Sequence, residues 1–173
     1  MNTNDELVKA YLVSDEMDIT KSFLKKVEHT FRTSLEYKQM LFTHRDVELE
    51  NSCLFLDDID FTEKGLSLEF HHIITLYTLA EWTTKLLLKN GCRNITTFEV
   101  CNKLAEIHFE DKVPYVFLAK TMHEVQHSEQ KYKYEIPLKD IQGNYKALIE
   151  EYKEVLTEND KKLVMLSLGI EVK

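Results

Sequence analysis

Four of the seven histidines occur in two close pairs, and imidazole both binds divalent metal ions and transfers protons near neutral pH. His71 and His72 are adjacent, at the end of a segment that alternates like a β-strand. His123 and His127 are four residues apart at the start of a predicted helix, so both rings lie on one helix face and can reach one cation. The two pairs together predict a metal site whose ligands come from separate elements.

Each pair also has a purely structural interpretation. Successive side chains of a strand point to opposite faces, so one of His71 and His72 would pack inward while the other faces solvent. His123 and His127 can equally form an exposed helix face. Short spacings of this kind also arise by chance, and both interpretations stay open on spacing alone.

The segment Leu68-Glu-Phe-His71-His72-Ile is followed downstream by an apolar segment and His123-x-x-x-His127. This pattern resembles the HNH endonuclease family with its ββα-metal core, and in particular phage-type HNH proteins with a helical insertion. The resemblance implies that His71, His123 and His127 bind one divalent ion, either Mg, Mn, Ni or Zn. It also implies that His72 is the general base in the hydrolysis of phosphodiester bonds in DNA, while the ion stabilises the leaving oxygen.

Several charged residues have expected supporting roles around these histidines. Glu69 or Glu124 can accept a hydrogen bond from a ligand imidazole and fix its tautomer. Arg45, Lys112 and Lys120 are candidates for phosphate contacts, although lysine and arginine are more often solvated surface charges.

A second alternative is a zincin-type metallopeptidase, because His123-Glu124-Val125-Gln126-His127 fits the pattern H-E-x-x-H. In that case the two histidines bind zinc and Glu124 is the general base. Thr121-x-x-Glu124 forms a capping box that predicts a helix beginning at about Met122. The zincin motif usually lies deeper inside a helix, and this alternative leaves His71 and His72 unexplained.

A third alternative is a non-catalytic, HNH-like binding or scaffold protein. The chain has 22 basic and 30 acidic side chains and a formal net charge of -8, which weighs against a large non-specific DNA interface. Val113-Pro114 also stands where the HNH family has an asparagine. DNA is the expected partner of a nuclease, whereas a scaffold would bind a protein partner or form a homo-oligomer.

Composition limits the class of protein. A chain of 173 residues with 43% hydrophobic residues, four glycines and two prolines predicts one folded domain over residues 1–173 and excludes collagenous and wholly disordered proteins. No apolar run is long enough to cross a membrane, and the N-terminus lacks a secretory pattern. Three cysteines without a C-x-x-C pair indicate a reducing cytoplasm, which is the host cytoplasm for a phage-encoded chain.

The elements that must position the histidines form a mostly helical α+β fold. Apolar residues spaced by four from Ile19 to Leu35 predict a helix that breaks near Ser34. Segments 53–56 and 66–72 predict a small β-hairpin, which with the helix of His123 makes a ββα-metal-like core. An inserted helical pair and flanking N- and C-terminal helices complete the fold. The capping box Thr96-x-x-Glu99 predicts the start of the second inserted helix, and the apolar spacing from Ile141 to Val155 fits one long C-terminal helix. We expect residues 1–17 to be loosely ordered, 53–75 and 113–130 to form the two core halves, 76–112 to form the insertion, and 140–168 to form the C-terminal helices.

Overall fold

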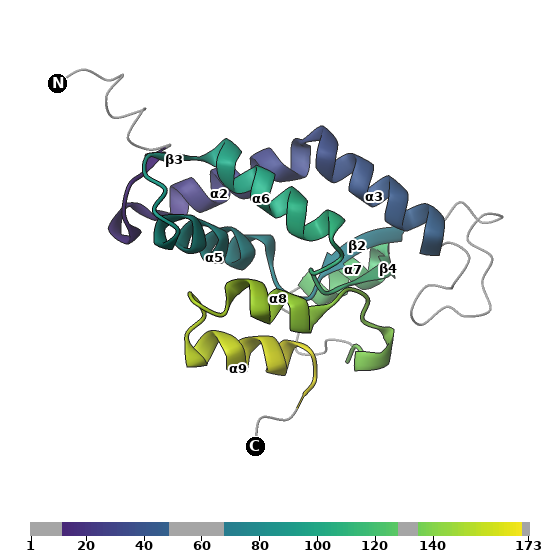
Figure 1. Cartoon of the computed structure of the whole chain (residues 1–173). Helices are drawn as coiled ribbons and strands as arrows, with labels where there is room; N and C mark the ends of the chain where they lie inside the picture. The colour runs from purple at the N-terminus through teal and green to yellow at the C-terminus, as the bar shows by residue number, and fades with distance from the viewer. Residues whose placement is uncertain (1–11, 49–67, 128–134, 171–173) are drawn as a thin grey trace.

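The structure is a computed structural model that describes residues 12–48, 68–127 and 135–170 (Figure 1). Within these ranges the chain has seven α-helices and two small antiparallel two-stranded sheets, which confirms the predicted, mostly helical α+β class. The helices are α2 (Lys21–Thr33), α3 (Leu35–Glu48), α5 (Leu76–Lys89), α6 (Thr97–Phe109), α7 (Lys120–His127), α8 (Tyr145–Tyr152) and α9 (Glu158–Ser167). The strands are β1 (Leu12–Val13), β2 (Leu68–His72), β3 (Ile95–Thr96) and β4 (Tyr115–Ala119), and two short 3-10 helices are η1 (Glu16–Asp18) and η2 (Leu138–Asp140).

The N-terminal helix α2 follows directly from the apolar spacing. Thr20 caps the helix by accepting a hydrogen bond from the backbone N–H of Phe23 at 3.1 Å. Phe23, Val27 and Phe31 are at most 1% exposed, because this face packs against α5 and α6. The backbone of Ser34 is extended and separates α2 from α3, so the predicted break near this residue is confirmed.

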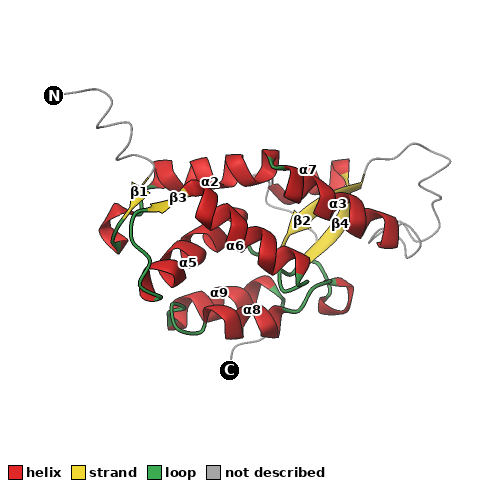
Figure 2. Cartoon of the chain, turned by 45° about the horizontal axis from the view of Figure 1, so that its top comes forward, coloured by secondary structure: helices red, strands yellow, loops and turns green. Residues whose placement is uncertain are grey.

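Helices α5 and α6 lie beside α2 and contribute to the same core (Figures 1 and 2). Trp82 of α5 is 1% exposed, and Leu104 of α6 is fully buried. The capping box predicted at the start of α6 is confirmed: the Glu99 N–H donates to the Thr96 hydroxyl at 3.3 Å, and the Thr96 N–H donates to the Glu99 carboxylate at 2.8 Å.

The second sheet pairs β2 with β4 in antiparallel register, with His71 opposite Val116 and His72 opposite Tyr115. Segment 53–56, the partner that the sequence predicted for this strand, lies outside the described residues. Helix α7 follows β4 directly and packs against both strands. In the described residues, the structure shows an antiparallel strand pair with one helix, but it does not show the predicted ββα-metal core. The elements α5, β3 and α6 lie between the two strands in sequence.

The C-terminal helices α8 and α9 lie side by side (Figures 1 and 2). Tyr152 of α8 shares a buried hydrogen bond of 2.6 Å with the hydroxyl of Thr83 on α5, which joins this pair to the core. The sequence predicted one long helix from Ile141 to Val155. The structure instead ends α8 at Tyr152, and Thr157 begins a new helix by capping α9.

Candidate metal centre

Strand β2 separates its two histidines onto opposite faces. The burial of its five residues alternates, with Leu68, Phe70 and His72 buried against the core and Glu69 and His71 only partly buried. Joint use of His71 and His72 in one site would require the strand to end or bend before them, and it does neither. The structure therefore agrees with the structural interpretation of this pair, in which one ring points inward and the other outward.

Helix α7 presents His123 and His127 to the partly buried face of β2. The two residues are four apart on an eight-residue helix that contacts the strand, so both rings face His71. One ligand atom from each of the three histidines lies within 4.8 Å of the others. The ring centre of His71 lies 5.2 Å from that of His123 and 5.0 Å from that of His127, and the ring centres of the two α7 histidines are 4.5 Å apart.

A carboxylate orients one of these rings. The Oε2 atom of Glu69 lies 2.5 Å from Nδ1 of His123, and because a carboxylate only accepts, Nδ1 carries the hydrogen. In the neutral ring, Nε2 then holds a lone pair, and this atom lies 3.0 Å from Nε2 of His127. Glu69 and His71 reach the same site because residues two apart on a strand share a face. The arrangement is that of three imidazole nitrogens able to bind one ion, with a carboxylate behind one of them.

His72, the residue expected to be a general base, lies in a different environment. It is 8% exposed, its ring stacks on Tyr37, and its Nε2 lies 3.0 Å from Nε2 of His108. Nδ1 of His108 donates to the Leu104 carbonyl oxygen at 2.6 Å, so Nε2 of His108 must accept, and the Nε2–H of His72 must donate.

Burial sets the charge of this second pair. Desolvation lowers the pKa of His72 well below its usual value, and nearby His108 lowers it further. Desolvation also lowers the pKa of His108 to about 4. Both rings are therefore neutral at pH 7. The pair is a buried hydrogen-bonded unit between β2 and α6, on the opposite face of the strand from the three-histidine cluster.

Among the described side chains, the other predicted site residues do not join the three-histidine cluster. Lys112 pairs with Glu110 and Glu151 at 2.6 Å each, which ties it to α8. Glu124 is exposed and lies 4.0 Å from Lys120, whose side chain is also exposed. Arg45 belongs to α3, and its side chain lies outside the described residues.

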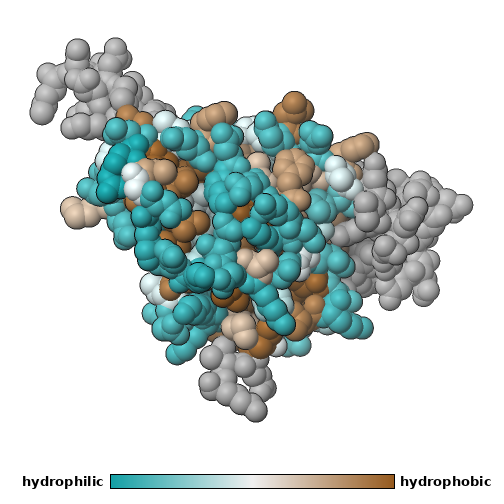
Figure 3. All heavy atoms as spheres, viewed as in Figure 1, coloured by the Kyte–Doolittle hydropathy of each residue, from teal (hydrophilic) through white to brown (hydrophobic). Residues whose placement is uncertain are grey.

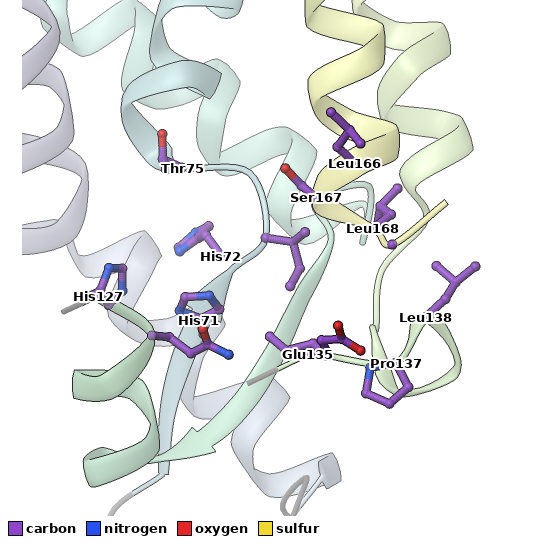
Figure 4. A pocket seen from close by; sticks show the side chains of 14 residues that line it. His71, His72, Thr75, His127, Glu135, Pro137, Leu138, Leu166, Ser167 and Leu168 are labelled. Atoms are coloured by element: carbon purple, nitrogen blue, oxygen red, sulfur yellow. The ribbon is translucent and has the colours of Figure 1, made fainter. Parts of the chain in front are cut away.

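A cavity of about 760 Å³ opens beside the three-histidine cluster (Figure 4). Figure 4 shows His71, His127 and the edge of His72 on one side of it, and Pro137, Leu138, Leu166 and Leu168 on the other. The C-terminal end of α9 and the segment that leads into η2 thus form a wall that faces the imidazoles, and this wall carries the polar side chains of Glu135 and Ser167 among its apolar ones. Sequence reasoning missed this wall, because nothing local in residues 135–138 or 166–169 indicates that they meet β2.

Sequence reasoning also missed the role of His108, although a signal was present. His108 lies four residues after Leu104 and seven after Cys101, and all three are buried on one face of α6. A histidine on an apolar helix face must have a polar partner inside the protein. The spacing could therefore have indicated a buried histidine, but not that its partner is His72.

A helical α+β fold with a histidine cluster at a strand–helix contact is compatible with many functions. Comparison of the whole chain with known protein families gives the class of protein. The family model described as bacteriophage G278-like virion protein matches residues 1–168, and the chain belongs to this family. No curated protein and no solved structure matches the chain.

The family overturns the HNH resemblance. The prediction of a DNA endonuclease was wrong, as were the descriptions of the chain as a hydrolase and as DNA-binding, because the whole-chain match is to a virion protein family. The physical reason is that short histidine spacings recur in unrelated folds, and here His72 faces the core. The zincin-type peptidase is not retained either. The description as a phage protein agrees with the match, and none of the described helices is long and apolar enough to cross a membrane.

Proposed function

We propose that this chain is a structural protein of a phage particle, where it contacts other protein subunits or further copies of itself. The observation that carries the proposal is the match of residues 1–168 to a virion protein family. Because the match extends over nearly the full length, it includes every helix and strand described above. A structural role needs this fold as a stable building block and requires no catalytic group.

The surface supports contacts with protein. Three phenylalanines, Phe42, Phe98 and Phe109, are 67%, 67% and 52% exposed. Aromatic side chains are enriched where proteins meet, since they bury a large apolar area with little loss of conformational entropy. Figure 3 shows apolar side chains on a face that is otherwise mostly hydrophilic. The net charge of -8 favours protein partners over a duplex backbone of phosphates.

A role in the phage particle also changes the location that we expect for the chain. The host cytoplasm predicted from the sequence would be where the chain is made and folded, and the assembled particle would be its final location. The two cysteines that the structure describes fit this history, since both are free thiols, Cys101 buried in the helical core and Cys92 exposed.

The test is whether the protein is part of purified particles. Particles are banded on a density gradient, treated with protease to remove adhering proteins, and analysed by quantitative mass spectrometry. We expect the chain at a fixed copy number per genome, and we expect particles made without it to be defective in assembly or infection. Recovery of the chain only in the unassembled lysate, with normal particles in its absence, would overturn the proposal.

Surface variants test the kind of contact. Phe42→Ser on α3 should lower the copy number in particles while leaving the melting temperature of the isolated protein unchanged, because this side chain is exposed. Lys38→Ser is the matched control, an exposed residue one helical turn earlier, and should be incorporated normally. Equal incorporation of both variants would remove Phe42 from the contact surface.

A further inference from the structure

We propose that His71, His123 and His127 bind one divalent transition-metal ion of the Zn²⁺ class, with a coordination position directed to the adjoining cavity. The inference stands on the geometry of β2 and α7. It is independent of whether the chain is incorporated into a particle.

The distances fit a tetrahedral ion. Ligand nitrogens at about 2.0–2.1 Å from an ion lie roughly 3.3 Å from each other in tetrahedral geometry. Nε2 of His123 and Nε2 of His127 are 3.0 Å apart, so these two atoms need to separate only slightly for the ion to bind between them. Three imidazoles on one such ion have ring centres roughly 5 Å apart. The observed separations are 5.2, 5.0 and 4.5 Å.

The donor set selects the class of ion. Imidazole nitrogen suits Zn²⁺, Ni²⁺, Co²⁺ and Cu²⁺, whereas Mg²⁺ and Ca²⁺ prefer carboxylate, carbonyl and water oxygens. The nearest carboxylate, Glu69, is engaged by Nδ1 of His123. Of the ions that the sequence left open, Zn²⁺ and Ni²⁺ therefore fit the site, whereas Mg²⁺ and Mn²⁺, which prefer oxygen ligands, do not.

The site is oriented before an ion binds. Glu69 holds His123 in the tautomer whose Nε2 lone pair points to His127, as a carboxylate behind a ligand histidine does in metal proteins. The ion would take the place of the hydrogen now shared by the two Nε2 atoms. His71 and His127 also line the cavity, so a fourth ligand, water or a side chain of a neighbouring subunit, reaches the ion from that side (Figure 4).

Bound metal should stabilise the fold. The ion would link β2 to α7, which are about fifty residues apart in sequence, and the unfolded chain does not hold these ligands together. At a free Zn²⁺ concentration about 100-fold above Kd, we expect the melting temperature to rise by about 5–10 °C.

The experiment uses the full chain, stripped with a chelator and then dialysed. Thermal unfolding is followed with Zn²⁺, Ni²⁺, Co²⁺ or Mg²⁺, and bound metal is counted by mass spectrometry of elements. We expect one Zn²⁺ per chain, a rise in melting temperature with Zn²⁺, Ni²⁺ and Co²⁺, and no rise with Mg²⁺. Absence of binding by Zn²⁺, or an equal response to Mg²⁺, would overturn the proposal.

Variants locate the site. His127→Ala should abolish the Zn²⁺-dependent rise yet keep the melting temperature of the metal-free protein, because His127 is exposed. Glu69→Gln should weaken Zn²⁺ binding about 10–100-fold without changing the stoichiometry. His29→Ala, which removes an exposed histidine of α2, is the control and should respond like the wild type. An unchanged response of His127→Ala, or a lost response of His29→Ala, would place the ion elsewhere.

Discussion

The hydrogen bond between His72 and His108 places two neutral imidazoles inside the protein. Each ring is satisfied by a partner: His72 donates to His108, and His108 donates to the Leu104 carbonyl. The aromatic rings of Tyr37 and Phe70 surround His72, with ring centres 6.2 and 4.7 Å away. Protonation of either ring would break this pattern and place a charge in an apolar interior.

This pair predicts a loss of stability in mild acid. The pKa of His108 is lowered from 6.5 to about 4 in the folded protein, so between these values the unfolded chain binds a proton that the folded chain does not. Stability from this group is full above pH 6.5 and decreases as the pH falls toward 4. We expect the free energy of unfolding to fall by about 2 kcal/mol from this histidine between pH 7 and pH 5.

Urea unfolding at both pH values, with a chelator present, measures this change. His108→Leu removes the titrating group, so its decrease between pH 7 and pH 5 should be smaller by that amount, whatever its stability at pH 7. The same decrease in the variant and the wild type would contradict the assignment of the pH dependence to His108.

For single residues, the sequence predicted which side chains share a face of a helix or strand, because this depends on local periodicity. The spacing of His123 and His127 placed them on one helix face, and the alternation of β2 placed Glu69 and His71 together. The contact of His72 with His108 joins residues 36 positions apart, and no local pattern encodes it. The resemblance assigned a role to His72 without showing which way its ring points, and in the structure that ring packs inward against His108.

The segment between η2 and α8 is fixed against the start of β4. Gln142 and Tyr115 exchange two backbone hydrogen bonds, and the Asn144 N–H donates to the carbonyl oxygen of Asp111 at 2.7 Å. Gly143 lies between them with a φ of +82°, and a Cβ there would lie 2.2 Å from the Val113 carbonyl oxygen. Glycine therefore permits both the left-handed backbone and the close approach of two segments.

Gly143→Ala should lower the free energy of unfolding by about 2–4 kcal/mol, since it combines backbone strain with a clash against backbone atoms. Gly91→Ala is the matched control: its φ is +87°, but a Cβ there meets nothing within 4 Å, so we expect a loss of about 1 kcal/mol. Chemical denaturation of both variants gives the comparison. Equal losses would show that the approach of Gly143 to Val113 does not matter.

Element boundaries were predictable where side chains set them. The break at Ser34 and the capping box of Thr96 were both evident from the sequence. The box expected at Thr121 was wrong, because α7 begins at Lys120 as a direct continuation of β4. The partner of β2 could not be predicted, since pairing over the intervening helices depends on how these pack and not on a nearby turn.

The buried residues form one continuous core from α2 to the end of α9, and this cluster includes Phe31, Leu79, Phe117, Tyr152 and Leu168 as buried positions. The prediction of a single domain over 1–173 therefore has a physical test. Trp82 is the single tryptophan of the sequence and is 1% exposed within this core, so its fluorescence reports on the core itself.

We expect unfolding followed by Trp82 fluorescence and by far-ultraviolet circular dichroism to give one coincident transition, because one shared core leaves no part to unfold alone. The C-terminal helices would join that transition through the hydrogen bond of Tyr152 with Thr83. A dichroism change that precedes the fluorescence change would indicate that part of the helical structure unfolds independently of this core.

The order of residues in β2 has one more consequence. If the strand slipped by one position along β4, every side chain would change faces, and His71 and His72, being identical neighbours, would not resist the exchange. Resistance comes from the preceding pair: a slip would drive the carboxylate of Glu69 into the apolar interior and expose the ring of Phe70 to water. These two residues thus determine which histidine becomes the ligand and which joins the core.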